Sequence, residues 1–223
     1  MDIENILNEI EKIYPNPQTE LYYNTPFQLL VAVVLSAQTT DKQVNKITRD
    51  QWLFDKIKTP KDVLKLWYEN LREKIKTIGL TNSKSKNIYK LSSKILEFTN
   101  PETKQERRIL ENYWYIIPSF YDKIITLPWV WEKTAKVVLS VLFDKPTIPV
   151  DTHVHRVVNR LGVVKTAYPE QTSKELEKII PDDLKNKSHH LLILFWRYFC
   201  TAKNPSCKIC PFAEFCRYYN NKL

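Results

Sequence analysis

Apolar residues recur along the chain at the three-to-four-residue spacing of amphipathic helices, and polar or proline-containing breaks separate the periodic stretches. The first stretch covers residues 2–14 and ends at a Pro-Asn-Pro break. Residues 26–37 are apolar nearly all round, which predicts a central core helix with Thr25 as its cap and Pro26 in its first turn. No stretch of any length alternates apolar and polar residues as a half-buried strand does. The pattern predicts an all-α fold.

Shorter helices are expected along the rest of the chain. They fall at 41–52, after Thr59-Pro60, before Gly79, from Asn82 to Phe98, and near 152–161, 171–179 and 187–200. Two more short helices, punctuated by Pro101 and Pro118, precede residue 127. All four cysteines follow the last of these helices.

The stretch 127–160 predicts a short turn, an apolar-periodic helix, a connection containing prolines, and a second helix that opens on an acidic residue. Lys133 falls in the first turn of the first helix, where the positive end of the helix dipole favours the neutral amine, a nucleophile. Asp151 precedes the second helix and is a carboxylate that could take protons or stabilise a cation. The alternative is a solvated surface lysine and an N-capping aspartate.

The cysteines Cys200, Cys207, Cys210 and Cys216 are spaced C-x6-C-x2-C-x5-C within seventeen residues. So compact an array, with no cysteine elsewhere, is unlike a set of scattered disulfides. Thiolates bind zinc and iron–sulfur clusters alike. Structural zinc sites usually present two close cysteine pairs, and this array contains one, so its spacing departs from the usual zinc pattern.

Together these two stretches resemble the endonuclease III family of DNA glycosylases. The matching residues are Lys133, Val150-Asp151-Thr152-His153 and the cysteine array, and further matches are LSAQTTD at 35–41, TIGL-x-NSK at 77–84 and SHHLLILFWRYFC at 188–200. The resemblance covers nearly the whole chain, and the cysteine spacing is its most specific motif. Lys133 separates the chain from the adenine–oxoguanine mismatch glycosylases, whose pattern lacks a lysine at this position.

The resemblance implies two helical lobes with a central DNA-binding cleft, a helix-hairpin-helix motif and a C-terminal loop that holds a [4Fe-4S] cluster. One lobe would be a six-helix barrel over residues 19–145. The other would combine residues 1–18 with 146–223. The cluster would be structural, bound by the four cysteines, and would fix a loop that carries Lys203 and Lys208 near DNA phosphates.

The resemblance also implies a bifunctional enzyme of base excision repair. Lys133 would attack the anomeric carbon of the deoxyribose and displace an oxidised pyrimidine. The resulting imine would permit β-elimination at the abasic site. Asp151 would stabilise the developing positive charge and help to deprotonate the lysine. His155 is interpreted as structural, and His153 is left open.

A base within a duplex cannot be reached, so it must be flipped out and the gap filled. Gln38 and Leu80 match the two wedge positions of the family, although Gln38 could be only a helix C-cap and Leu80 a core residue. The hairpin Pro128-Trp129-Val130-Trp131 would bind a DNA phosphate through its backbone amides. Tyr22, Tyr23, Tyr113 and Tyr115 are interpreted as packing residues.

Composition narrows the class of partner. The 43% hydrophobic content with helical patterning excludes a disordered chain. The formal net charge of +9 and pI near 9.2 favour a polyanionic partner. The resemblance implies that this partner is double-stranded DNA with damaged bases or abasic sites. No apolar run is long enough to span a membrane, and the acidic N-terminal helix differs from a signal peptide. We expect a cytoplasmic monomer.

Glycine usage is anomalous. The chain has two glycines and six tryptophans, whereas average usage predicts about sixteen glycines. The family's hairpin has glycine where this chain has Trp129 and Trp131, and Trp67, Trp114 and Trp196 also align with usual glycine positions. One hypothesis is that UGA codons, which some bacteria read as glycine, were translated as tryptophan. The alternative is a true but weakened or non-catalytic iron–sulfur DNA-binding homologue, because two indoles in the hairpin should impair phosphate binding.

Overall fold

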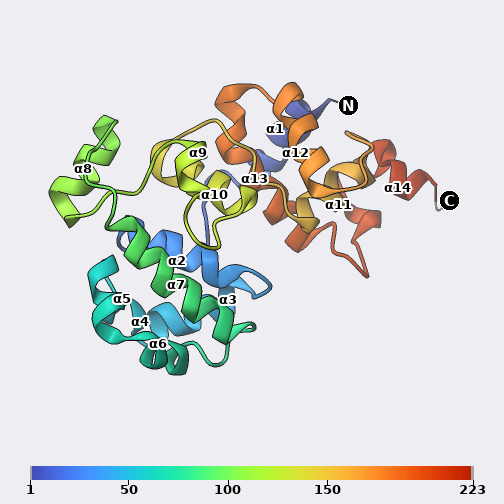
Figure 1. Ribbon diagram of the computed structural model, residues 1–223. Coiled ribbons are helices and arrows are strands. Elements are labelled where there is room, and N and C mark those ends of the chain that lie inside the picture. The colour runs from blue at the N-terminus through green and yellow to red at the C-terminus, as the bar shows by residue number, and fades with distance from the viewer. Residues whose placement is uncertain (1, 222–223) are drawn as a thin grey trace. The chain divides into compact units, whose positions relative to one another are not determined.

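A computed structural model describes residues 2–221, and within this range every regular element is helical (Figure 1). The predicted all-α class is confirmed. Contacts divide the chain into two compact units, Glu20–Phe143 and Met1–Thr19 with Asp144–Leu223. We call them the hairpin unit and the cysteine unit. None of the described helices is long and apolar enough to cross a bilayer.

The hairpin unit contains nine α-helices and one π-helical turn: α2 (Pro26–Ser36), α3 (Asp41–Asn45), η1 (Lys46–Asp50), α4 (Leu53–Lys56), α5 (Pro60–Leu66), α6 (Tyr68–Lys74), α7 (Thr81–Ile95), α8 (Lys104–Tyr113), α9 (Tyr121–Ile124) and α10 (Glu132–Phe143). Helix α2 lies at its centre and contacts α3, α7 and α10, and α5 and α6 pack on α7 (Figure 1).

Helix α2 shows why the sequence folds as it does here. The Thr25 hydroxyl accepts a hydrogen bond from the backbone N–H of Gln28, and Pro26 occupies the first turn, as predicted. Every residue from Phe27 to Leu35 is buried. The one long polar side chain among them, Gln28, is satisfied because its amide donates to the carbonyls of Phe54 at 2.6 Å and Ile57 at 3.0 Å.

The cysteine unit contains α1 (Ile3–Ile13), α11 (Thr152–Leu161), α12 (Pro169–Ile179), α13 (Asp182–Tyr198), the 3-10 turns η2 (Cys207–Ile209) and η3 (Ala213–Phe215), and α14 (Arg217–Asn220). Helix α13 packs against both α1 and α11, and α14 packs against α11 (Figure 1). The apolar side of α1 is buried through Ile3, Ile6, Leu7 and Ile10.

Three predicted helices are corrected. The expected helix at 41–52 breaks into α3, η1 and a left-handed residue, Trp52, at φ 58°. Helix α12 begins at Pro169 rather than residue 171, because proline suits the first turn. Helix α13 begins at Asp182 rather than residue 187, since Asp182 and Asp183 favour the positive end of the helix dipole.

The four tyrosines pack within the hairpin unit, as interpreted. The Tyr115 hydroxyl accepts a hydrogen bond from the backbone N–H of Phe27 at 3.0 Å, and the two rings meet edge to face. Burial raises the pKa of Tyr115 to about 12. Tyr113 packs on Tyr115, Tyr22 stacks near the Phe54 ring, and Tyr23 is partly buried against the core.

Candidate functional site

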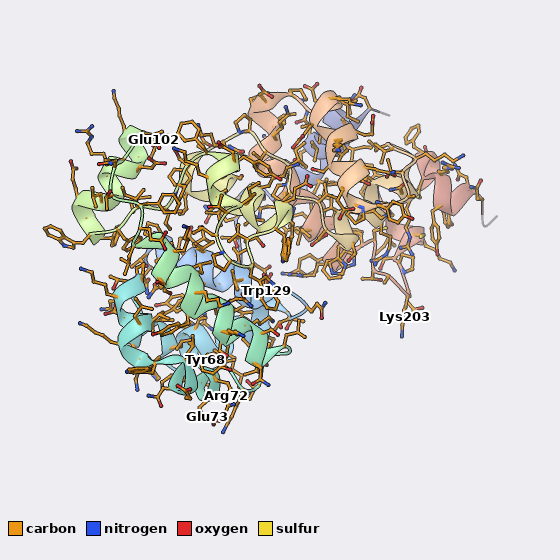
Figure 2. The ribbon with its side chains drawn as sticks, viewed as in Figure 1. Tyr68, Arg72, Glu73, Glu102, Trp129 and Lys203 are labelled. Carbon is orange, nitrogen blue, oxygen red and sulfur yellow. The ribbon has the colours of Figure 1, made fainter. Side chains whose placement is uncertain are left out.

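A tight turn joins α9 to α10. The backbone N–H of Val130 donates to the carbonyl of Leu127 at 3.1 Å, and Trp129 has φ 63°. Proline at the second turn position and positive φ at the third define a type II turn, whose third position normally requires glycine. Trp129, labelled in Figure 2, therefore occupies the one turn position that a side chain strains.

Lys133 is the second residue of α10, directly after this turn, as predicted. Its side chain is half-buried, and the residues that follow it in α10 are buried in the core of the hairpin unit. The adjacent carboxylate of Glu132 pairs with Lys136 at 2.8 Å, one helical turn further on. The turn and the core together fix the backbone from which the Lys133 amine projects.

Asp151 caps α11 in the cysteine unit, as predicted. Its Oδ1 accepts hydrogen bonds from the backbone N–H groups of His153 and Val154, each at 2.9 Å. A helix N-terminus favours negative charge, so this position suits a carboxylate in its ionised form. Capping and a chemical role are therefore compatible at this residue.

The two histidines near Asp151 differ in their surroundings. His155 Nδ1 lies 2.6 Å from the Thr172 hydroxyl and 3.2 Å from the Asn159 amide nitrogen, which ties α11 to α12. These contacts support the structural interpretation of His155. The His153 ring stacks on Trp196 of α13 with ring centroids 3.6 Å apart.

The two predicted wedge residues lie on neighbouring loops of the hairpin unit. Gln38 follows α2 with φ 55°, and its side chain is exposed. Leu80 precedes α7 with φ 59° and is 48% exposed, so the interpretation of Leu80 as a core residue is wrong. The loops are in contact, because a Cβ added to Gly79 would lie 3.9 Å from the Gln38 carbonyl oxygen.

The cysteine loop runs from the end of α13 to the start of α14, and all four thiols are free. Arg160 of α11 organises one side of it. The guanidinium donates to the carbonyls of Thr201 at 2.8 Å and Ala202 at 2.9 Å and lies 3.6 Å from the Cys200 sulfur. The Cys216 thiol donates to the Arg160 carbonyl at 3.3 Å. Both ends of the loop are thus fixed to one residue of α11.

The thiols fit an iron–sulfur cluster by their chemistry. Burial raises the pKa of the Cys210 thiol to about 11 and also raises that of Cys200, and nearby cysteines add to both shifts. Four mutually interacting thiols beside an arginine are soft ligands whose negative charge a cation partly offsets. Within residues 2–221 no three His, Cys, Asp or Glu residues are grouped as ligands of one ion, so the fit rests on this donor chemistry.

Lys203 lies at an exposed position of the same loop and projects away from it (Figure 2). Lys208 is also exposed, on η2. Both positions are accessible to a polyanion.

Comparison with known proteins decides the family. Residues 31–182 match the model of the HhH-GPD superfamily base excision DNA repair proteins, and residues 200–216 match the iron–sulfur binding domain of endonuclease III. Endonuclease III of Rickettsia conorii is 46% identical over 220 residues, 97% of each chain. Endonuclease III of Escherichia coli K12 is 42% identical over 213 residues, 96% of this chain and 93% of the relative.

The chain belongs to the endonuclease III family. The solved structure of a trapped endonuclease III–DNA covalent intermediate, an estranged-adenine complex, is 39% identical and superposes with a TM-score of 0.85, covering 99% of this chain and 96% of that chain. The predicted family, its place in base excision DNA repair and the [4Fe-4S] cluster as cofactor are confirmed.

Two features of this family member were missed from sequence. Trp52 aligns with no usual glycine position, although it too has positive φ and is 66% exposed. Lys84 belongs to the TIGL-x-NSK match, and its side chain is fully buried beside the Gln38 loop. A lysine four residues after Leu80 on an otherwise amphipathic helix was the available signal, because it falls on the buried side of α7.

Proposed function

We propose that this endonuclease III family member is a DNA glycosylase with abasic-site lyase activity on oxidised pyrimidines in duplex DNA, with Lys133 as nucleophile. The observation that carries the proposal is the placement of Lys133 in the first turn of α10, directly after the type II turn. A related endonuclease III has been solved as a trapped covalent intermediate with DNA, which supports an amine nucleophile.

The Lys133 amine attacks the anomeric carbon of the damaged nucleotide, and the bond from that carbon to the base breaks. The base leaves with the bonding electron pair and takes up a proton. Loss of the amine proton and opening of the sugar ring give an imine, which acidifies the neighbouring C2′ hydrogen. Removal of that proton expels the 3′ phosphate by β-elimination. Water then hydrolyses the imine and restores the lysine.

Asp151 acts on charge and protons in this scheme. Its carboxylate is held by two backbone N–H groups, so it is oriented before the substrate arrives. It stabilises the positive charge that develops on the sugar as the base departs, and it accepts a proton from the attacking amine.

DNA binding is assigned to the hairpin and the loops. Within Pro128–Trp131, the backbone N–H groups of the three residues other than proline bind a DNA phosphate. Gln38 and Leu80 fill the space left by the flipped nucleotide. Lys203 contacts the phosphate backbone of the DNA. Cys200, Cys207, Cys210 and Cys216 would hold the cluster, which supplies a covalent cross-link for the loop that carries Lys203. The protein acts as a monomer in the bacterial cytoplasm, where free thiols persist.

A second candidate is a non-catalytic iron–sulfur protein that only binds DNA. Trp129 in the glycine position of the type II turn favours it, because the strained residue brings an indole to the surface that would meet the phosphate.

Borohydride trapping on a duplex with one thymine glycol separates the two candidates. We expect the protein to nick the duplex and to form a reduced covalent adduct. Lys133→Gln should lose the adduct and keep the fold, and Lys90→Gln, an exposed residue of α7, should retain both activities. Binding without nicking would favour the second candidate, and an adduct that persists in Lys133→Gln would move the chemistry to another amine.

Measurements of DNA affinity test DNA binding, which both candidate functions share. Affinity should fall steeply as salt rises, because lysine and arginine contacts to phosphates release counterions. A log–log plot of affinity against salt with no slope would contradict DNA binding through phosphates.

A further inference from the structure

Lys84 is a buried charged side chain of the hairpin unit that the proposed reaction does not use. Its Nζ donates to the carbonyls of Leu35 at 2.9 Å and Ala37 at 2.6 Å, and to the Thr39 hydroxyl at 2.9 Å. The side chain has no solvent exposure. Three N–H donors thus meet three oxygen acceptors, which is the full hydrogen-bonding capacity of an ammonium group.

The three acceptors bracket Gln38. Leu35 lies in the last turn of α2, where carbonyls lack partners within the helix and a cation is favoured by the helix dipole. Ala37 and Thr39 are the immediate neighbours of Gln38 on either side. Lys84 itself lies in the first turn of α7, and its backbone N–H donates to the carbonyl of Leu80 at 2.8 Å. One residue therefore contacts both wedge-bearing segments.

A second contact ties the same segments together. The Gln43 side-chain amide in α3 donates to the Thr77 hydroxyl at 3.1 Å, but this hydrogen bond is exposed to solvent. Burial makes the Lys84 contact the stronger restraint, because a buried donor that loses its acceptors cannot turn to water. Burial also lowers the pKa of Lys84 to about 8, so the group is still protonated at pH 7.

We propose that Lys84 is a positioning residue for base flipping, which holds the left-handed Gln38 loop and the Leu80 turn at a fixed separation so that both wedges enter the duplex together. Gln38 at φ 55° and Leu80 at φ 59° are both in a conformation that costs energy for a non-glycine residue, and the surrounding structure must hold them there. This inference rests on the proposed wedge roles of Gln38 and Leu80.

The experiment separates duplex opening from lysine chemistry in Lys84→Met. A duplex with a tetrahydrofuran abasic-site analogue opposite 2-aminopurine reports wedge insertion through the fluorescence of the unstacked base. Nicking of an abasic single strand reports the Lys133 reaction without opening a duplex. We expect Lys84→Met to slow thymine glycol cleavage in duplex DNA by about 10²-fold, as a misplacement of about 1 Å can. The fluorescence rise should be lost and the single-strand reaction retained.

The controls make each outcome decisive. Lys90→Met on the exposed side of α7 should leave both readouts unchanged. Thr39→Val removes one acceptor of Lys84, and should give the same selective loss at smaller size if Lys84→Met does not fold. Duplex opening at the wild-type level in the variant that folds, or a parallel fall of both readouts, would overturn the proposal for Lys84. Normal opening in Gln38→Ala and Leu80→Ala would instead overturn the wedge assignment.

A different observation carries a second inference. Four of the six tryptophans have left-handed backbones, at φ 58° to 64°: Trp52, Trp67, Trp114 and Trp129. Positive φ is uncommon for any non-glycine residue and is least suited to bulky side chains. Trp67 combines φ 64° with ψ 154°, a region that is essentially restricted to glycine. Trp114 ends α8 at the position where helices most often place glycine.

The surroundings of the remaining two tryptophans also do not favour an indole side chain. Trp131 is 72% exposed at the start of α10. Trp196 has a buried Nε1 with no hydrogen-bond partner among the described residues, although buried indole N–H groups usually find one. Trp196 does stack on His153, so its case rests on the unpartnered Nε1 and on its alignment with a usual glycine position of the family. The chain retains two glycines.

We infer that all six tryptophans stand where the cell that owns this gene inserts glycine by reading UGA codons. The test has two parts: the codons at the six positions, and mass spectrometry of the corresponding peptides from that cell. UGA codons with glycine in the peptides would support the inference. A UGG codon at any of the six positions, or tryptophan at any of them in the native peptides, would overturn it.

Discussion

The two units differ sharply in where they place left-handed backbone. Within the described residues, the hairpin unit has six non-glycine residues with positive φ: Gln38, Trp52, Trp67, Leu80, Trp114 and Trp129. The cysteine unit has one, Asp144, and a single left-handed glycine, Gly162. In the cysteine unit, α11 ends at Gly162, and glycine adopts positive φ freely. In the hairpin unit, α8 ends at Trp114, which has the largest side chain of any residue type.

The magnitude of this difference is large. A left-handed residue other than glycine costs roughly 1–2 kcal/mol, so four tryptophans would cost roughly 4–8 kcal/mol. Domains are stable by only about 5–15 kcal/mol. Strain of this size can be retained at a few functional residues, the role proposed here for Gln38 and Leu80. At the four left-handed tryptophans, three of which are exposed, no contact in the structure explains the strain. Left-handed strain therefore separates the loops proposed to be functional from the positions inferred to be glycine.

The largest expected effect tests whether the two units are stabilised in different ways. Cys207→Ser removes one of the four proposed cluster ligands, and metal binding contributes directly to the folding of such loops. We expect purified Cys207→Ser to lose iron and its broad absorbance near 400 nm. Hydrogen exchange should show lost protection over 200–216, α11 and α14, because Arg160 and Cys216 link the loop to α11.

The hairpin unit supplies the control for Cys207→Ser. Its core is built from helices α2, α7 and α10 with no metal ligand, so their exchange protection should stay near the wild-type level. Stoichiometric zinc and no iron in the wild-type protein, or equal loss of protection in both units, would contradict this division.

Asp151→Asn tests the chemical contribution of the cysteine unit. The amide retains an oxygen for the two backbone N–H groups that cap α11, so the fold should be kept. Loss of the negative charge and of the proton acceptor should slow turnover by about 10²–10⁴-fold. Single-turnover nicking of a thymine glycol duplex measures it. An unchanged rate with intact folding would limit Asp151 to its capping role.

Much of this arrangement followed from local sequence patterns. The Thr25 cap, the core helix α2, the position of Lys133 in α10 and the Asp151 cap all depend on residues within one or two turns. The break at Trp52 and the burial of Lys84 did not follow. The burial of Lys84 depends on contacts between segments distant in sequence, since Lys84 and Leu35 are separated by 49 positions. The break at Trp52 depends on a left-handed backbone that a tryptophan does not signal. The periodicity of apolar residues predicts which side of a helix is buried. It does not predict which hydrogen-bond acceptors from other segments will surround a buried amine.

A smaller effect should distinguish the two glycines. Gly162→Ala should destabilise the protein by about 1–2 kcal/mol, because alanine at φ 89° is strained. Its added Cβ would also lie only 3.2 Å from the Arg217 Cβ. Gly79→Ala is the matched control, since its Cβ would meet nothing closer than 3.9 Å and its φ is not left-handed. Denaturant unfolding measures both, and equal changes would show that φ at Gly162 is not the cause.

The smallest expected effect isolates left-handed strain in the hairpin unit. Trp114 is 79% exposed at φ 64°, so Trp114→Gly loses little buried area and should stabilise the protein by about 1 kcal/mol. Trp131 is nearly as exposed at 72% but is not among the described residues with positive φ. Trp131→Gly should therefore bring no gain and should cost up to about 1 kcal/mol through the added freedom of the unfolded chain.

The opposite signs of the two changes in stability are informative, because both substitutions remove the same side chain from similarly exposed positions. Only the backbone conformation at the two positions differs in the way that favours glycine at Trp114. Denaturant midpoints and slopes measured for both variants and the wild-type protein under the same conditions give the differences in unfolding free energy. Stabilisation of equal size in both would attribute the gain to removal of an exposed indole, and the left-handed tryptophans would lose their significance as misassigned glycines.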